Sequence, residues 1–397
     1  MKKIERALCT RRTALLGIAG AVAEIAACGG GGTGVAGLSS GGTGSFTSGT
    51  ITGFGSIIVN GIRYNNDTAS VLTSDDLVSS NPALQLGMVV NIEGSAVTPA
   101  STATGLSTAT AYRITYGSEW MGPVSNRSST TFQILGHTVD VLSTTFFSGA
   151  IQQFSSLTDA HFVEVYGYVD QVGGHIQASR IEVSTVQPAS YKLSGAITQI
   201  NQTSNTANLG QISIVWSDPS ALPSGVSSGD FVRVVLNPIP VGSVWTALRV
   251  ELLSSPLSRL ATDYDYEAEV NGSITAYQSS ASFVVNGIPV NASMAQITGT
   301  LAVGVQVDVE GNIRSGQLIA TKVAVRTVSQ IETQEFEFYG VISNVSAQTF
   351  VVRGETFYYD GNTLNSSVLT TNPLPYVEVK ARRTSGRWQA IEIDLND

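Results

Sequence analysis

The stretch Gly304-Val305-Gln306-Val307-Asp308-Val309-Glu310-Gly311 alternates apolar and polar side chains between two glycines. Successive side chains of a β-strand point to opposite faces of the sheet, so this alternation predicts a strand with one buried and one wet face. A similar stretch is Gly87-Met88-Val89-Val90-Asn91-Ile92-Glu93-Gly94, and shorter counterparts lie at 162–167, 230–235 and 376–380. One type of strand therefore recurs five times along the chain.

Three further elements recur with this strand. A Gly-x-[IV] step precedes it at Gly49, Gly122, Gly195, Gly272 and Gly340. An apolar run with a central glycine follows each step, at Asn60-Gly61, Leu135-Gly136, Leu209-Gly210, Asn286-Gly287 and Arg353-Gly354. These runs predict hairpin turns, because Asn and Gly accept the positive φ of a type I′ turn. An Ala-x-x-[IV] frame closes each copy, at Ala111, Ala178, Ala247, Ala320 and Ala390.

The repeat predicts an all-β protein of five tandem small modules with about five strands each. Their expected ranges are 47–116, 117–187, 188–262, 263–330 and 331–397. Each module is expected to contain a strand, a hairpin, a strand, an irregular connection and two more strands. A helical turn in that connection would give the order of an OB-like barrel, although another small β-barrel or sandwich fits the same pattern.

The four shared elements resemble the tandem-repeat domain of unknown function of bacterial lipoproteins, of the DUF5666 type. The resemblance covers nearly everything from Thr47 onward, and copies one, two and four match it best. Leu236 and Ala381 replace the last glycine of the strand stretch in copies three and five. The resemblance implies a place in the cell envelope and a repeat architecture, and it supplies no catalytic residue.

Residues 1–27 are predicted to be a signal peptide, with a basic stretch, an apolar run over 14–23 and small residues before Cys28. Ile25, Ala26 and Ala27 resemble the lipobox that precedes a lipidated cysteine, so we expect an acyl (palmitate-type) lipid anchor on Cys28. An ordinary signal with an incidental cysteine is the alternative. Arg11 and Arg12 resemble a twin-arginine signal, which leaves this route and general secretion both open.

Residues 28–46 are expected to be the lipidated cysteine and a flexible linker, because they are nearly all Gly, Ser, Thr and Ala. Gly29 after the cysteine resembles lipoproteins sent to the outer membrane. We therefore predict anchoring there, facing either the periplasm or the cell exterior.

The charge balance argues against nucleic acid as a partner. Lys and Arg number 21 against 30 Asp and Glu, a net charge of −9, and removal of the basic signal would make the chain more acidic still. Cys9 lies in the predicted signal, so the mature chain would keep one cysteine and no internal disulfide.

Four cations share one place in the closing frame: Arg113, Arg180, Arg249 and Lys322. They form either a weak ligand surface or a row of cross-strand ion pairs, with Glu164 and Asp308 facing Arg180 and Lys322. Arg233 is expected to lie opposite Arg249 and to repel it.

Other candidate residues are given structural interpretations. Three histidines fall in the second module and are expected to be exposed, with no metal site predicted: His137, His161 and His175. Four acids on one strand are too far apart for a calcium cage and are expected to be a solvated face: Asp263, Asp265, Glu267 and Glu269. Aromatic stacking surfaces are considered, but core packing is preferred, for Trp120, Tyr266 and Phe338.

No nucleophile elbow, phosphate-binding loop, dinucleotide fingerprint or thiol pair occurs in the sequence. We therefore expect a non-enzymatic envelope lipoprotein without cofactor, whose module array displays a binding surface for a protein or glycan partner. A purely structural spacer is the alternative, and a carboxylate-dependent hydrolase is a distant third. The ligand and the oligomeric state are left open.

Overall fold

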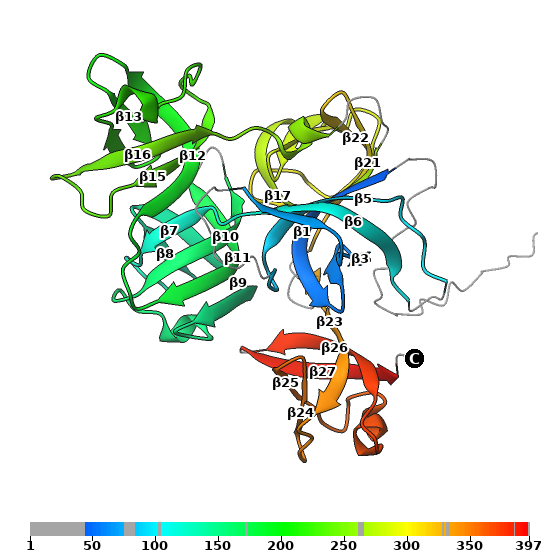
Figure 1. Ribbon diagram of the computed structural model, residues 1–397. Coiled ribbons are helices and arrows are strands. Elements are labelled where there is room, and N and C mark those ends of the chain that lie inside the picture. The colour runs from blue at the N-terminus through cyan, green and yellow to red at the C-terminus, as the bar shows by residue number, and fades with distance from the viewer. Residues whose placement is uncertain are drawn as a thin grey trace, which may run out of the picture. The chain divides into compact units, whose positions relative to one another are not determined.

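The computed structural model describes residues 44–74, 84–101, 105–170, 174–260, 266–327, 329–330, 334–384 and 386–395. β-strands dominate these residues and form small barrel-like sheets, which confirms the predicted all-β class (Figure 1). Four 3-10 helices are also present in this part of the chain: η1 (Phe154–Ser156), η2 (Pro219–Ala221), η3 (Pro256–Arg259) and η4 (Ser366–Thr370). The predicted signal, Cys28 and most of the linker lie outside the described residues.

Segment 4 (residues 266–325) contains a closed circuit of strand pairings. Its strands are β17 (Tyr266–Ser279), β18 (Ser282–Val285), β19 (Ile288–Asn291), β20 (Gln296–Thr298), β21 (Gln306–Arg314) and β22 (Gln317–Val325). β17 pairs antiparallel with β18, β18 with β19, β21 with β22, and β21 with β17. A parallel pairing between β19 and β22 closes the circuit.

Segment 5 (residues 336–395), drawn in orange and red in Figure 1, has the same order of pairings. Its strands are β23 (Phe336–Ser343), β24 (Thr349–Val352), β25 (Glu355–Tyr358), β26 (Tyr376–Thr384) and β27 (Arg387–Leu395). Antiparallel pairs join β23 to β24 and β26, β24 to β25, and β26 to β27. β25 and β27 pair in parallel.

Segment 2 (residues 120–184) follows a closely related order. Its strands are β7 (Trp120–Pro123), β8 (Thr131–Ile134), β9 (His137–Gly149), β10 (Phe162–Val169) and β11 (His175–Ser184). β10 pairs with β7 and β11, β8 pairs with β9, and β9 and β11 are parallel. An isolated bridge between Ser125 and Gln133 connects the end of β7 to β8.

Segments 1 (residues 44–116) and 3 (residues 191–252) complete the described chain. Segment 1 contains β1 (Gly44–Phe54), β2 (Ile57–Val59), β3 (Ile62–Asn65), β4 (Ser70–Thr73), β5 (Val89–Gly94) and β6 (Ser107–Tyr116). Segment 3 contains β12 (Tyr191–Asn201), β13 (Thr206–Leu209), β14 (Ile212–Val215), β15 (Phe231–Leu236) and β16 (Val244–Leu252). Parallel pairs β3–β6 and β14–β16 stand where β19–β22 stands in segment 4.

The predicted hairpins are confirmed, and four of the five turns have positive φ at both predicted residues; the turn in segment 3 was predicted one residue too early, because it consists of Gly210 and Gln211 and only Gly210 has positive φ. Asn286 and Gly287, between β18 and β19, have φ values of 53° and 75°. A type I′ turn requires such positive values at both of its central residues. The Asn286 side chain also folds back and donates to the Asn271 carbonyl oxygen at 2.9 Å. There it lies so close to Gly272 that a Cβ on that glycine would be 2.1 Å from Asn286 Oδ1. The Gly-x-[IV] step and the hairpin are thus two halves of one contact.

Glycine is required at the end of the repeated strand stretch for a different reason. The register of β21 against β22 shifts between Glu310 and Gly311. At Gly311 a Cβ would lie 2.1 Å from the carbonyl oxygen of Ile319, so the two strands approach too closely for any side chain there. Gly167 is in the same situation, because its Cβ would lie 2.1 Å from the Gln177 carbonyl oxygen.

Pairings also join segments that are far apart in the sequence. β1 pairs in parallel with β17 of segment 4 and with β23 of segment 5. β7 of segment 2 meets β12 of segment 3 at Met121 and Lys192. The apolar cores follow these junctions, because one cluster unites segments 2 and 3, another unites segments 1 and 5, and Phe46 of β1 joins the core of segment 4.

Candidate functional site

Two of the four aligned cations form the cross-strand pairs that the sequence favoured. Arg113 contacts Glu93 at 3.0 Å and Lys322 contacts Glu310 at 2.7 Å, and in each pair the two residues are direct register partners. The predicted partner Asp308 was wrong by two residues on the same strand face, since Asp308 lies opposite Ala324. Segment 5 keeps the pair with its charges exchanged, because Lys380 contacts Glu392 at 3.1 Å.

Arg180 is buried, with 4% of its surface exposed, so it is no exposed ligand surface. Its register partner is Tyr166 rather than the predicted Glu164. The guanidinium donates to Glu182 Oε1 at 3.0 Å and crosses to segment 1, where it donates to the Leu86 carbonyl oxygen at 3.0 Å. Arg180 therefore connects two segments.

The predicted repulsion between Arg233 and Arg249 was also wrong. Arg233 lies opposite Glu251, with 3.6 Å between the charged groups, and it donates to the Ser74 carbonyl oxygen at 2.6 Å. Arg249 lies opposite Val235. Buried Arg233, like Arg180, thus donates to a neighbouring segment.

The three histidines have separate environments. His137 is buried, contrary to the prediction, and packs edge-on against Trp120 with 5.4 Å between ring centroids. Burial lowers the pKa of His137. His161 accepts a hydrogen bond from the Thr158 amide at 3.0 Å, and exposed His175 lies 3.3 Å from Asp140. The described residues hold no cluster of three His, Cys, Asp or Glu side chains with metal-binding geometry.

The acidic strand is not the solvated face that we expected. Asp263 and Asp265 lie outside the described residues, but Glu267 and Glu269 are buried, with 5% and 8% of their surfaces exposed. β17 lies between β1 and β21, so its polar face is covered by another segment. Burial, reinforced by Asp308 and Glu310, raises the pKa of Glu269 to about 8.

The aromatic residues that were considered as stacking surfaces lie mainly in the apolar cores. Trp120 and Phe338 are buried, and the Trp120 indole donates to the Ser194 carbonyl oxygen at 2.9 Å. Tyr266 is half-buried beside the core of segment 4. The preference for core packing over a stacking surface is thus supported for Trp120 and Phe338.

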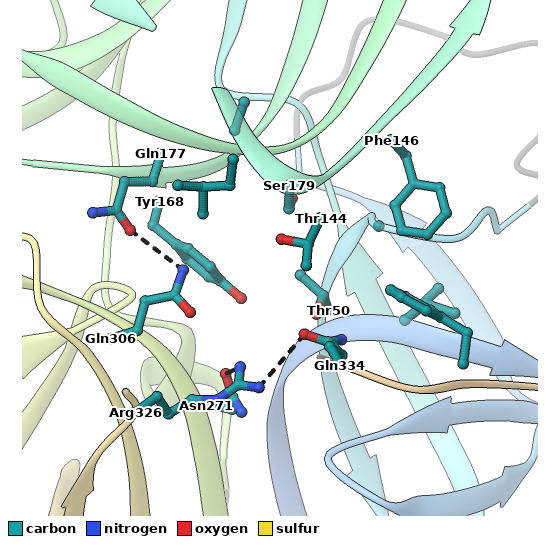
Figure 2. Close-up of a pocket in the computed structure, with 15 residues that line it drawn as sticks. Thr50, Thr144, Phe146, Tyr168, Gln177, Ser179, Asn271, Gln306, Arg326 and Gln334 are labelled. Carbon is teal, nitrogen blue, oxygen red and sulfur yellow. Dashed lines mark hydrogen bonds between the residues drawn. The ribbon is translucent and has the colours of Figure 1, made fainter. Parts of the chain in front are cut away.

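A polar cavity lies where segments 1, 2, 4 and 5 meet (Figure 2). Its volume is about 30 Å³. That is room for one or two water molecules. The polar side chains that line it are Thr50, Thr144, Tyr168, Gln177, Ser179, Asn271, Gln306, Arg326 and Gln334. Sequence reasoning missed this site, because its polar residues come from segments 1, 2 and 4 and from the connection between segments 4 and 5, which contains Arg326 and Gln334.

Tyr168 is the most unusual residue of the cavity. Only 6% of its surface is exposed, and its hydroxyl makes no hydrogen bond of good geometry among the described residues, although the Thr50 side chain is close enough to lower its pKa. Figure 2 shows the ring directed into the cavity, with Thr50, Gln306 and Arg326 around it. Burial raises the pKa of the hydroxyl, which therefore stays protonated and can donate.

The amides of the cavity wall are held by one another. Gln306 donates to Gln177 Oε1 at 3.4 Å, and Gln177 donates to the Gly304 carbonyl oxygen at 2.6 Å, as Figure 2 shows in part. These bonds fix the wall between segments 2 and 4. The sequence signal for the site is weak: Tyr168 follows the last glycine of the repeated strand stretch, where Ser95 and Asn312 stand in segments 1 and 4.

Comparison with known families adds the last observation. Three segments match the model of a domain of unknown function, DUF5666. The matched residues are 121–182, 271–324 and 339–394, in segments 2, 4 and 5. The fifth copy is thus among the matches although Ala381 replaces its glycine, and the first copy, which we expected to match well, is not among them. No curated protein matches the chain. Within the described residues, no helix is long and apolar enough to cross a membrane.

Proposed function

We propose that this chain is a non-enzymatic lipoprotein of the bacterial envelope whose tandem β-modules form a binding body for a protein or glycan partner. The five segments would be five OB-like modules. The strand pairings support this proposal. In a five-stranded OB barrel the strands pair in the order 1-2-3-5-4, and strand 4 pairs again with strand 1. β17, β18, β19, β22 and β21 pair in this order in segment 4.

The proposed anchor is a lipid on Cys28, placed in the outer membrane after export by the general secretory or the twin-arginine route. Two or three acyl chains, at about 0.8 kcal/mol per buried methylene, would hold such a body at the membrane without any apolar protein surface. A linker of about 17 Gly- and Ser-rich residues would reach roughly 20 to 25 Å.

The observation that carries the binding role is the cavity shared by four segments, where Tyr168 Oη is buried without a hydrogen bond of good geometry among the described residues. A buried hydroxyl in that state costs about 1–3 kcal/mol, so such a group is usually retained where water or a ligand completes it. A spacer would need no such group at the meeting point of its segments.

A thermal-shift screen of the full chain in mild detergent tests this role. The panel would contain envelope glycans, small metabolites and basic proteins. A ligand at about one hundred times its Kd stabilises the folded state by roughly 2.7 kcal/mol, which is a clear rise in Tm. If no ligand shifts Tm and in-cell crosslinking captures no partner, the spacer becomes the better explanation.

Replacing the cysteine tests the anchor independently. Cys28→Ser should move the protein from the membrane to the soluble fraction, and Cys9→Ser is the matched control that should leave it in membranes. Membrane retention of the Cys28→Ser variant would refute the lipid anchor.

A further inference from the structure

The shared cavity has hydrogen-bond donors that lack good acceptors. Tyr168 Oη makes no hydrogen bond of good geometry among the described residues, and Thr50 is the one side chain within weak reach of it there. Within the described part of the chain, the terminal nitrogens of Arg326 donate to Asn271 Oδ1 at 3.4 Å and to Gln334 Oε1 at 3.5 Å. Both distances exceed the roughly 2.7–2.9 Å that is typical of a guanidinium with a carboxylate. The donors are therefore in place without a strong partner.

The charge of the cavity has one sign. Arg326 is the single formally charged side chain among the described residues that line it. Asp308 lies behind Asn271 and accepts a hydrogen bond from the Asn271 side-chain amide at 2.6 Å. Burial raises the pKa of Asp308 and the positive charge of Arg326 lowers it, so Asp308 is a partial counter-charge for the guanidinium from behind the cavity wall.

The size of the cavity limits the ligand. Its volume of about 30 Å³ is small. A space of this size accommodates one or two water-sized groups and excludes a whole sugar ring. Two oxygens of one carboxylate fit this limit, and they would present acceptors to both donors. A neutral alcohol would satisfy the size but would offer the guanidinium no charged acceptor inside the cavity.

We propose that the cavity binds a single carboxylate or a similar small oxyanion, which accepts hydrogen bonds from Tyr168 Oη and the Arg326 guanidinium. The carboxylate is either a free small anion or an acidic end group on a larger ligand. This inference rests on the proposed binding function and names the chemical group that the cavity would bind.

Titration of the full chain in mild detergent with three compounds tests the site, with Tm as the readout and sodium chloride at equal ionic strength as the reference. The compounds are acetate, glucuronate and glucose. Stabilisation by acetate alone assigns the site to a free anion, and stabilisation by acetate and glucuronate without glucose assigns it to an acidic end group. If neither acid raises Tm beyond the chloride reference, the cavity holds water only and the proposal fails.

Two variants assign the effect to the cavity. Tyr168→Phe keeps the ring and removes the hydroxyl, and Arg326→Gln removes the charge. Each should weaken the apparent Kd for the acid about tenfold, as expected for one lost hydrogen bond to a charged group. Tyr112→Phe and Arg382→Gln, at an exposed tyrosine and a surface ion pair, are the matched controls and should leave Kd unchanged.

An unchanged Kd in both cavity variants would overturn the proposal even if wild-type protein binds acid. Should Tyr168→Phe fail to fold, Arg326→Gln gives the same decision, because Arg326 is only half-buried. Glycan or protein binding that survives Arg326→Gln would leave the proposed function standing and remove this site from it.

Discussion

Glu269 and Glu337 occupy the same place in two segments, each three residues before a Gly-x-Ile step, and each lies on a strand that pairs in parallel with β1. Glu269 lies opposite Thr47 and Glu337 lies opposite Gly53. Burial raises the pKa of both carboxyls, to about 8 and about 7. At both junctions β1 thus pairs with a strand that carries a buried acid, and at pH 7 Glu269 is largely protonated whereas Glu337 is about half protonated.

The junction at Glu269 should make stability depend on pH. An unfolded glutamate titrates near pH 4.3, whereas the folded pKa is about 8. Between these two values the folded chain binds the proton more tightly than the unfolded chain. This contribution to stability is complete below about pH 4.3 and is lost as the pH rises through about 8. Lys322 is nearby, but it already pairs with Glu310 at 2.7 Å.

Glu269→Gln should therefore flatten the fall of Tm between pH 5 and 9 and raise Tm at pH 9, because an amide needs no proton there. Melting curves across this range give the measurement. Glu335→Gln is the control, since Glu335 lies nearer the surface and pairs with Arg382 at 2.8 Å. Equal slopes for wild type and Glu269→Gln would contradict the buried-acid explanation.

Glu337→Gln should change the pH dependence of stability over a range that ends at a lower pH than that of Glu269→Gln. The Glu337 pKa of about 7 reflects burial and the neighbouring Glu378, and Tyr339 donates to Glu337 Oε2 at 3.2 Å. The variant should reduce the Tm slope between about pH 4.3 and 7, where Glu269 also contributes, and leave the slope between about pH 7 and 8, which belongs to Glu269 alone. If Glu337→Gln also flattens the slope between about pH 7 and 8, the two acids do not titrate independently.

Arg180 and Arg113 share one place in the repeat, and their truncation should have unequal effects. Arg180→Met removes buried bonds to Glu182 and to the Leu86 carbonyl oxygen. Losing these bonds should cost about 2 kcal/mol or more. Arg113→Met removes a half-exposed pair, which should cost under about 1 kcal/mol. Denaturant unfolding measures both, and equal losses would show that Arg180 does not connect the segments.

The sequence predicted the strands and turns that depend on neighbouring residues, and it missed the contacts that two or more segments form together. Alternation over 304–311 and the Asn-Gly turns fix each strand and hairpin, because both depend on a few neighbouring residues. The burial of Glu267 and Glu269 follows from β1, which comes from the other end of the chain. Alternation shows which side chains share a face and leaves open which strand covers it. The Tyr168 cavity escaped prediction for the same reason, since four segments build it.

The glycine of the Gly-x-[IV] step gives the sharpest test of the repeat, because the segments differ in what a methyl group would meet. At Gly272 it would lie 2.1 Å from Asn286 Oδ1, whereas at Gly195 it would lie 3.5 Å from Leu209 Cδ1, an ordinary contact. Gly272→Ala must displace a turn side chain that is bonded to Asn271. Such overpacking should cost about 1–3 kcal/mol. Gly195→Ala should be nearly neutral in the same unfolding measurement. Similar losses in both variants would mean that backbone freedom, rather than the Asn286 contact, selects glycine at this step.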